Sequence, residues 1–156
     1  MSTVETVLYN LQEVRRRSRK VWDGLPAEQL QWRPDPEAMS CIEHVRHLLE
    51  ADYLWHRMVE TRASVDDAQT PWTGRPMVSV ADEVAFAEEH RARFLAAVAA
   101  FTDEDLQRIT IDRSDRGYVR PLGDFLLRAA YHEAVHTGQL LGYLRSMGVA
   151  RPKVWD

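Results

Sequence analysis

The stretch PLGDFLLRAAYHEAVHTGQLLGYLRSMG, residues 121–148, has the pattern of a single long helix. Pro121 is a residue that helices favour in their first turn. Gly148, with Pro152 a few residues beyond it, is typical of a helix end. A helix of this length extends roughly 40 Å, at ~1.5 Å per residue, which is enough to run the full length of a small domain.

Three earlier stretches carry the same kind of pattern, with apolar residues at helical spacing along one face. They cover residues 3–23, 40–62 and 79–101. The first two begin with a capping box, in which a serine is followed three residues later by a glutamate. Four long amphipathic helices without a convincing strand predict an all-α fold, a four-helix bundle in which residues 1–156 form one domain.

The connections between the predicted helices are long. Residues 63–78 and 108–120 contain polar, irregular segments, and only a short capped turn and a brief extended piece are expected near the second of them. A simple up-and-down bundle needs shorter loops. The lengths therefore predict a crossover connection, or a function located in these loops.

The composition of the chain excludes several classes of protein. The net charge is −4, so no nucleic-acid partner is expected, and the run Arg15–Lys20 is interpreted as a solvated outer face. No apolar run approaches ~18 residues, so no membrane partner is expected and a cytoplasmic location is predicted. A single cysteine, Cys41, excludes an internal disulfide framework and is interpreted as a small buried residue.

The last helix carries His132 and His136, which spell H-E-x-x-H together with Glu133. Residues four apart lie on one face of a helix, one turn above the other. Two imidazoles in this arrangement can bind one metal ion. The alternative is a pair of buried histidines that form hydrogen bonds to neighbouring helices.

A zinc peptidase is the usual meaning of this motif, but the rest of the chain does not support it. Peptidases of this type take their third ligand from downstream, and no histidine or glutamate follows His136. No strand pattern is present that could hold an extended peptide. The third ligand should then come from the helix over residues 40–62, where His44, His47 and His56 are candidates and the helical wheel modestly favours His47.

Three segments of the chain together resemble one family. The segment MSCIEHVRHL is similar to the pattern W-S-x-x-E-x-x-x-H-L, with Met39 in place of the tryptophan; the matching residues are Ser40, Glu43, His47 and Leu48. The segment HEAVHTGQL resembles H-x-x-x-H-x-G-Q, matched by His132, His136, Gly138 and Gln139. The connector LPAEQLQWRPDP is also similar, so the chain resembles the DinB-like, YfiT-like superfamily of metal-dependent enzymes over nearly its whole length.

The resemblance implies a four-helix bundle in which His47, His132 and His136 bind one divalent metal ion. Zinc, nickel, iron and manganese all suit such a site, because imidazole is a good ligand for several of these metals. Several members of the family are thiol-dependent, among them bacillithiol- and mycothiol-dependent transferases and a mycothiol-dependent maleylpyruvate isomerase. Dimers are common in the family, so a homodimer is possible here.

The first functional hypothesis is a metal-dependent transferase that directs a low-molecular-weight thiol at a small electrophilic substrate. The loops 63–78 and 108–120 would shape its pocket. A carboxylate-bearing substrate could bind to polar residues of the second loop, unless they only form a solvated surface; these are Arg113, Arg116, Tyr118 and Arg120.

Two other functions stay open. A hydrolase that uses metal-bound hydroxide would be active without any thiol, and a non-catalytic, metal-stabilised bundle would act through its surface. Close packing of the last helix, within the bundle or in a dimer, is suggested by a ridge of small residues: Ala130, Ala134, Gly138 and Gly142. Glu133 is expected beside the ligands in a supporting role or on the surface, and Gln139 is expected to orient a ligand or bond a loop.

Overall fold

The computed structural model describes all residues from Met1 to Asp156. Its long helices are α1 (Thr3–Asp23), α2 (Cys41–Thr61), α3 (Val80–Ala99) and α5 (Leu122–Ser146). The shorter elements are η1 (Ala27–Gln29), α4 (Asp103–Arg108), β1 (Thr110–Arg113), η2 (Ser114–Arg116) and β2 (Tyr118–Pro121). The four predicted helices are confirmed, with ends that differ by at most two residues.

Local hydrogen bonds explain where the first two long helices begin. Both capping boxes are present: Ser2 accepts from the backbone N–H of Glu5, and the Glu5 carboxylate accepts from the N–H of Ser2 in return. Ser40 and Glu43 make the same exchange at the start of α2. Each box satisfies backbone donors that the first turn of a helix leaves free, and the sequence signal for it is entirely local.

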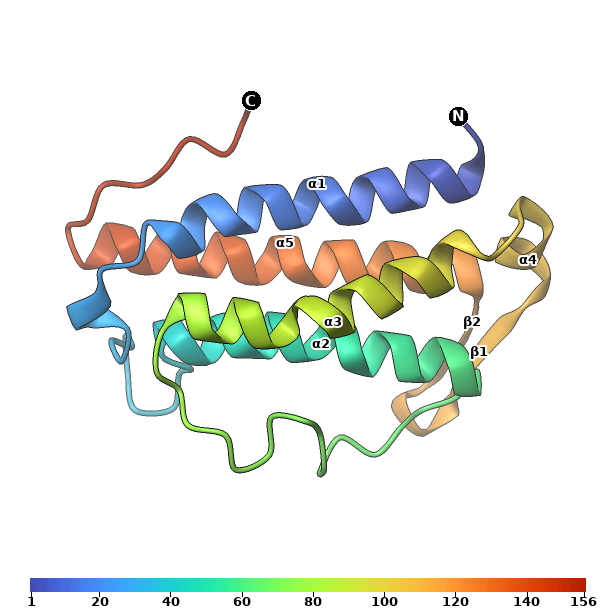
Figure 1. Cartoon of the computed structure of the whole chain (residues 1–156), viewed down its shortest axis with the longest axis horizontal. Coiled ribbons are helices and arrows are strands. Elements are labelled where there is room, and N and C mark those ends of the chain that lie inside the picture. Colours follow the sequence, from blue (N-terminus) through green and yellow to red (C-terminus); the bar gives the residue numbers. More distant parts are fainter.

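The four long helices form a bundle in which α1 lies against α5 and α3, while α2 lies against α3 and α5. Helices that follow one another in the chain, α1 and α2, therefore occupy diagonal corners. Figure 1 shows that α2 and α3 run in the same direction, so the connection of residues 62–79 returns along the length of the bundle. This long return is the predicted crossover connection.

A β-hairpin caps one end of the bundle, where only a brief extended piece was expected. Strands β1 and β2 pair antiparallel, with Thr110 opposite Pro121 and Arg113 opposite Tyr118. Gly117 has a φ of 83°, a left-handed conformation that suits glycine at the turn. Strands of four residues are too short to show a clear alternation, so the pairing was not predictable from the pattern.

The interior consists of two apolar clusters separated by a layer of charged residues. One cluster lies towards the hairpin and includes Phe94 and Phe125, while the other includes Trp22 and Leu144. Each long helix contributes one side chain to the layer between them: Arg15 of α1, Asp52 of α2, Arg91 of α3 and Glu133 of α5. Such a layer couples all four helices.

Arg15 is at the centre of this layer, so its predicted position on a solvated face was wrong. Its guanidinium donates to Glu133 at 2.7 and 3.0 Å and to Asp52 at 2.9 Å, and only 13% of its side chain is exposed. Arg91 donates to the other oxygen of Asp52 at 2.8 Å. Burial lowers the pKa of Arg15, but the charges of Asp52 and Glu133 outweigh burial and raise it.

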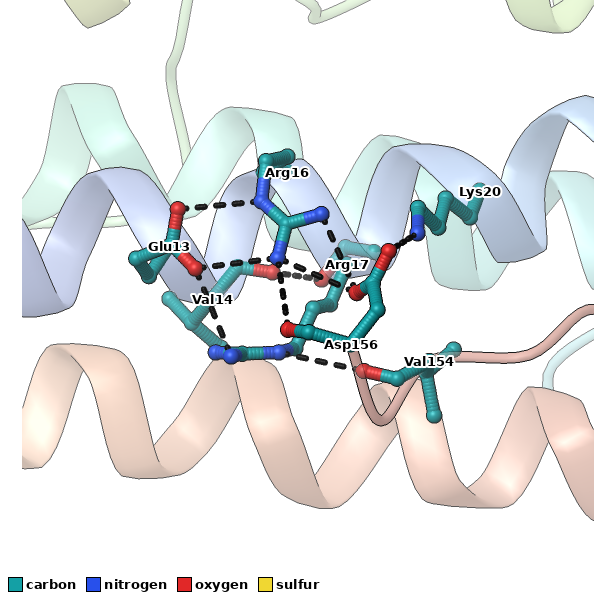
Figure 2. A network of polar contacts seen from close by, with 8 residues as sticks. Glu13, Val14, Arg16, Arg17, Lys20, Val154 and Asp156 are labelled. Carbon is teal, nitrogen blue, oxygen red and sulfur yellow. Dashed lines mark hydrogen bonds and ion pairs between the residues drawn. The ribbon is translucent and has the colours of Figure 1, made fainter.

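Arg16, Arg17 and Lys20 lie on the outer side of α1 and hold the C-terminal segment against it, whereas Arg19 pairs with Asp23 of its own helix at 3.9 Å. Figure 2 shows Arg16 between the carboxylates of Glu13 and Asp156, with Lys20 also paired to Asp156. Arg17 donates to the carbonyl oxygen of Val154 at 3.1 Å. The acidic partners explain why these positions do not form a free basic surface.

Cys41 is fully buried at the start of α2, as predicted. Burial raises the pKa of its thiol to about 11, so the thiolate that a nucleophile requires does not form near neutral pH. None of the helices combines the length and the apolar character that crossing a membrane requires.

Of the ridge of small residues on α5, only Ala130 packs inside the bundle. Ala130 is buried, but Ala134, Gly138 and Gly142 are exposed. An added methyl group at either glycine would meet no atom within 4 Å. The expectation of tight helix contact within the bundle is therefore wrong for these three positions.

Candidate metal centre

The three histidines predicted as ligands lie together where α2 packs against α5. His47 comes from the second turn of α2, and His132 and His136 come from successive turns of α5. The ring centroids are 4.6 Å apart for His132 and His136, 4.7 Å for His47 and His136, and 5.0 Å for His47 and His132. The packing of two helices thus brings together residues that are 85 positions apart in the chain.

The nitrogen atoms of these rings fit a single transition-metal ion. One nitrogen from each of the three side chains lies within 4.8 Å of the other two, and Nε2 of His47 is 3.0 Å from Nε2 of His132. Nitrogen ligands at ~2.0–2.1 Å from one ion are about 3.0–3.4 Å apart, so small movements of the rings would complete the site. Nδ1 of His132 is buried without a partner in the protein.

The environment keeps the rings in the form that binds metal. Burial lowers the pKa of His47 to about 4, and the neighbouring His136 adds to the effect. Burial, together with His47, likewise lowers the pKa of His132 to about 4. Since the neutral imidazole is the ligand, these rings have a free electron pair near neutral pH without first losing a proton.

The other candidate histidines have different partners. His44 is buried, and its Nδ1–H donates to the carbonyl oxygen of Ser40 at 3.2 Å. His56 lies 3.6 Å from Glu60 on another face of α2. The structure therefore separates His56 from the cluster and places His44 beside it as a hydrogen-bonded neighbour, with its ring centroid 5.4 Å from that of His136.

Gln139 lies between His44 and His136 and interacts with both. Its Oε1 lies 3.1 Å from Nε2 of His44. Burial lowers the pKa of His136, and hydrogen bonding to Gln139 opposes that effect. Gln139 therefore contacts a member of the cluster, which is the orienting position expected for it, and no hydrogen bond ties its side chain to a loop.

Glu133 turns away from the histidines, although it is part of H-E-x-x-H. It is 5% exposed, and both of its carboxylate oxygens accept from Arg15 of α1. Of the two expectations for Glu133, the surface position is therefore excluded, and a peptidase-like general base at this residue is inconsistent with its fixed ion pair. Its role is structural, in the charged layer behind the histidines.

A cavity of about 580 Å³ opens beside the cluster, with His47 and His132 in its wall. One side is apolar and comes from α2, where Leu54, Trp55 and Met58 line it. The rest of the lining comes from α5, from the hairpin and from Asp67 of the loop 62–79. The loops expected to shape a pocket do so, and the cavity has room for a small molecule that reaches the histidines.

The polar side of this cavity differs in part from the prediction. Arg113, Arg116 and Tyr118 line it, but Arg120 does not; its side chain pairs with Asp124 at 2.8 Å. Arg128 lines the cavity instead, and the sequence patterns did not predict it. The sequence did contain a signal for Arg128: it precedes His132 by four residues, so the two side chains lie on the same face of the helix.

The fold is a four-helix bundle in which α2 and α5 bring three histidines together, which makes this cluster a candidate metal centre. The family model described as the DinB superfamily matches residues 10–140, so the chain belongs to the DinB superfamily. Among curated proteins, no sequence matches the chain.

Three solved structures share the fold. The DinB-like protein YjoA of Bacillus subtilis is 21% identical, covers 96% of both chains and has a TM-score of 0.71. A DinB-like protein of Bacillus cereus is 21% identical, covers 97% of both chains and has a TM-score of 0.76. YfiT of Bacillus subtilis is 15% identical over 94% of this chain and 89% of its own, with a TM-score of 0.77, and is described as a probable metal-dependent hydrolase with an unusual four-helix bundle topology.

Proposed function

We propose that this protein is a divalent-metal-dependent enzyme that transfers a low-molecular-weight thiol to a small electrophilic substrate. The observation that carries the proposal is the convergence of three neutral imidazoles, those of His47, His132 and His136, beside an open cavity. Three protein ligands next to a cavity are typical of catalytic sites, whereas structural sites are closed by four. Zinc, nickel, iron and manganese are all compatible with this ligand set.

A divalent ion held by these histidines would lower the pKa of a thiol or water that binds to it. The protein's own residues then have two tasks, which are to hold the three rings and to position the substrate. Transfer is favoured over hydrolysis because Glu133, the nearest carboxylate in the motif, is committed to Arg15 and is not free to accept a proton from water.

Hydrolysis is a second candidate, because YfiT, which shares the fold, is described as a probable metal-dependent hydrolase. Asp67 lines the cavity and is the one carboxylate there that could assist a water molecule. A homodimer, a cytoplasmic location and the absence of a nucleic-acid or membrane partner stay predictions.

Two measurements test the proposal. Metal analysis of the purified protein should find about one divalent ion per chain, and His47→Ala, His132→Ala and His136→Ala should each lose most of it. His56→Ala is the matched control, because this histidine lies on the same helix α2 but away from the cluster. Full metal content in any of the three variants would remove that residue from the ligand set.

Activity is then measured with two probes, chlorodinitrobenzene with a panel of small thiols and nitrophenyl acetate without them. The proposal expects conversion of the first probe to require both the metal and a thiol. Turnover of the ester alone, lost on chelation, would favour the hydrolase instead. A metal-loaded protein inactive in both assays would support the non-catalytic alternative.

A further inference from the structure

Two arginines that line the cavity, Arg113 and Arg128, form no direct ion pair with a carboxylate. Arg113 donates through Nε to Ser64 at 3.1 Å and through Nη1 to the Tyr118 hydroxyl at 3.2 Å. Arg128 has its guanidinium 4.6 Å from the centroid of the Tyr118 ring, and its Nε is buried without a partner. Both side chains are partly buried, and both line the cavity.

Neighbouring arginines of the same region behave differently. Arg116 lies 3.4 Å from Asp115, and Arg120 pairs with Asp124 at 2.8 Å. Asp67 also lines the cavity, but it is exposed and forms an ion pair with neither arginine of the wall. Arg113 reaches Asp115 only through the Ser64 hydroxyl, which donates to that carboxylate. Holding two guanidinium groups in a partly desolvated wall without a carboxylate in direct contact is unfavourable, so their arrangement suits an anionic ligand.

The position of these arginines relative to the histidines restricts the shape of that ligand. Arg128 is one helical turn before His132 on α5, so the two side chains start about 5–6 Å apart on one face of the helix, and an anion held by Arg128 would lie beside the histidine cluster. Leu54, Trp55 and Met58 of α2 form the apolar wall of the same cavity. A ligand that fills the space therefore has an anionic end, an apolar middle and a reactive end near the histidines.

We infer that the cavity binds a small organic acid, with its carboxylate held by Arg113 and Arg128 and its apolar body held against the α2 wall. Guanidinium groups match the planar carboxylate through paired N–H donors, and Tyr118 holds both arginines in place. The inference rests on the proposed function only in taking the histidine end as the reactive end. The anion site belongs to the protein whether or not a metal is bound.

The test compares two ligands of nearly the same shape, benzoate and benzamide, by NMR titration of the isotope-labelled full chain. Metal content is measured first, and the titration is repeated after treatment with a chelator. Benzoate should bind at least about tenfold more tightly than benzamide, and should shift signals of Tyr118 and of the turn of α5 around Arg128. This preference should persist without metal.

The variants Arg113→Gln and Arg128→Gln should each weaken benzoate about tenfold and leave benzamide unchanged, because they remove charge and keep size. Arg93→Gln is the matched control, since Arg93 is exposed on α3 and pairs with Glu89. Equal affinity for the two ligands, no detectable binding of benzoate, or wild-type affinity in both cavity variants would overturn the inference.

The two proposals fail in different ways. A protein that binds no metal but binds benzoate through these arginines would refute the metal-dependent function and leave the anion site. If the protein has full metal content but binds benzoate equally well after Arg113→Gln and after Arg128→Gln, the anion site alone is refuted.

Discussion

Replacing Glu133 by glutamine separates a structural role from a catalytic one. The carboxylate accepts two hydrogen bonds from Arg15, at 2.7 and 3.0 Å, in a position only 5% exposed. Removing one partner of a buried ion pair typically costs about 3–5 kcal/mol. Asp52 still neutralises Arg15 at 2.9 Å, and glutamine leaves no void, so a value near the lower end, ~3 kcal/mol, is expected.

A chain of this size changes its melting temperature by about 2–4 °C per kcal/mol, so Glu133→Gln should melt roughly 6–12 °C below the wild type. The assay is thermal unfolding followed by circular dichroism, with a chelator present so that metal binding does not contribute. Glu13→Gln is the matched control. Glu13 also accepts from an arginine of α1, but at the surface, where solvent screens the pair and its contribution to stability is small.

Metal content should be the same in Glu133→Gln and in the wild type, because this side chain faces α1 and not the histidines. The reasoning would be refuted by a variant that melts like the wild type. A variant of unchanged stability that keeps its metal but loses an esterase activity would instead identify Glu133 as a general base.

Three further results are expected. The folded chain keeps His47 and His132 neutral, because their pKa values are about 4, compared with 6.5 for the free side chain. As the pH falls from 6.5 to 4, the unfolded chain takes up protons at these histidines before the folded chain does, so the metal-free protein should lose stability over this range. A melting temperature that stays constant from pH 6.5 to 4 would contradict this expectation. Arg46 of α2 pairs with the buried Glu83 and donates to the carbonyl oxygens of Arg75 and Pro76 in the loop 62–79. Arg46→Met should therefore cost about 3–5 kcal/mol of stability, because it leaves Glu83 buried without its partner, and it should make the loop more sensitive to protease. Unchanged stability in denaturant titration would show that the ion pair contributes little. Phe94→Ala, at a fully buried site, should cost about 3–5 kcal/mol by denaturant titration, and a loss below ~1 kcal/mol would mean that the core refills the space.

The helices and the pair of histidines on α5 follow from local patterns. Capping boxes, apolar spacing and terminal glycine or proline act within a few residues, so the bounds of all four long helices were predictable. The spacing of four between His132 and His136 places both rings on one face whatever the tertiary structure. The positions on a helical wheel favoured His47 over His44 as the third ligand only modestly, and the family resemblance added the stronger support for His47.

The partners of Arg15 and Glu133 could not be read from the chain, because 118 positions separate them. Arg15 stands in a run of basic residues and looks like a surface residue until the bundle places Asp52 and Glu133 around it. Arg128 likewise becomes part of a cavity wall only when the hairpin folds over α5. Local sequence specifies which face of a helix a side chain lies on, whereas its charge partners and its cavity depend on which helices meet, and that is a property of the packed bundle.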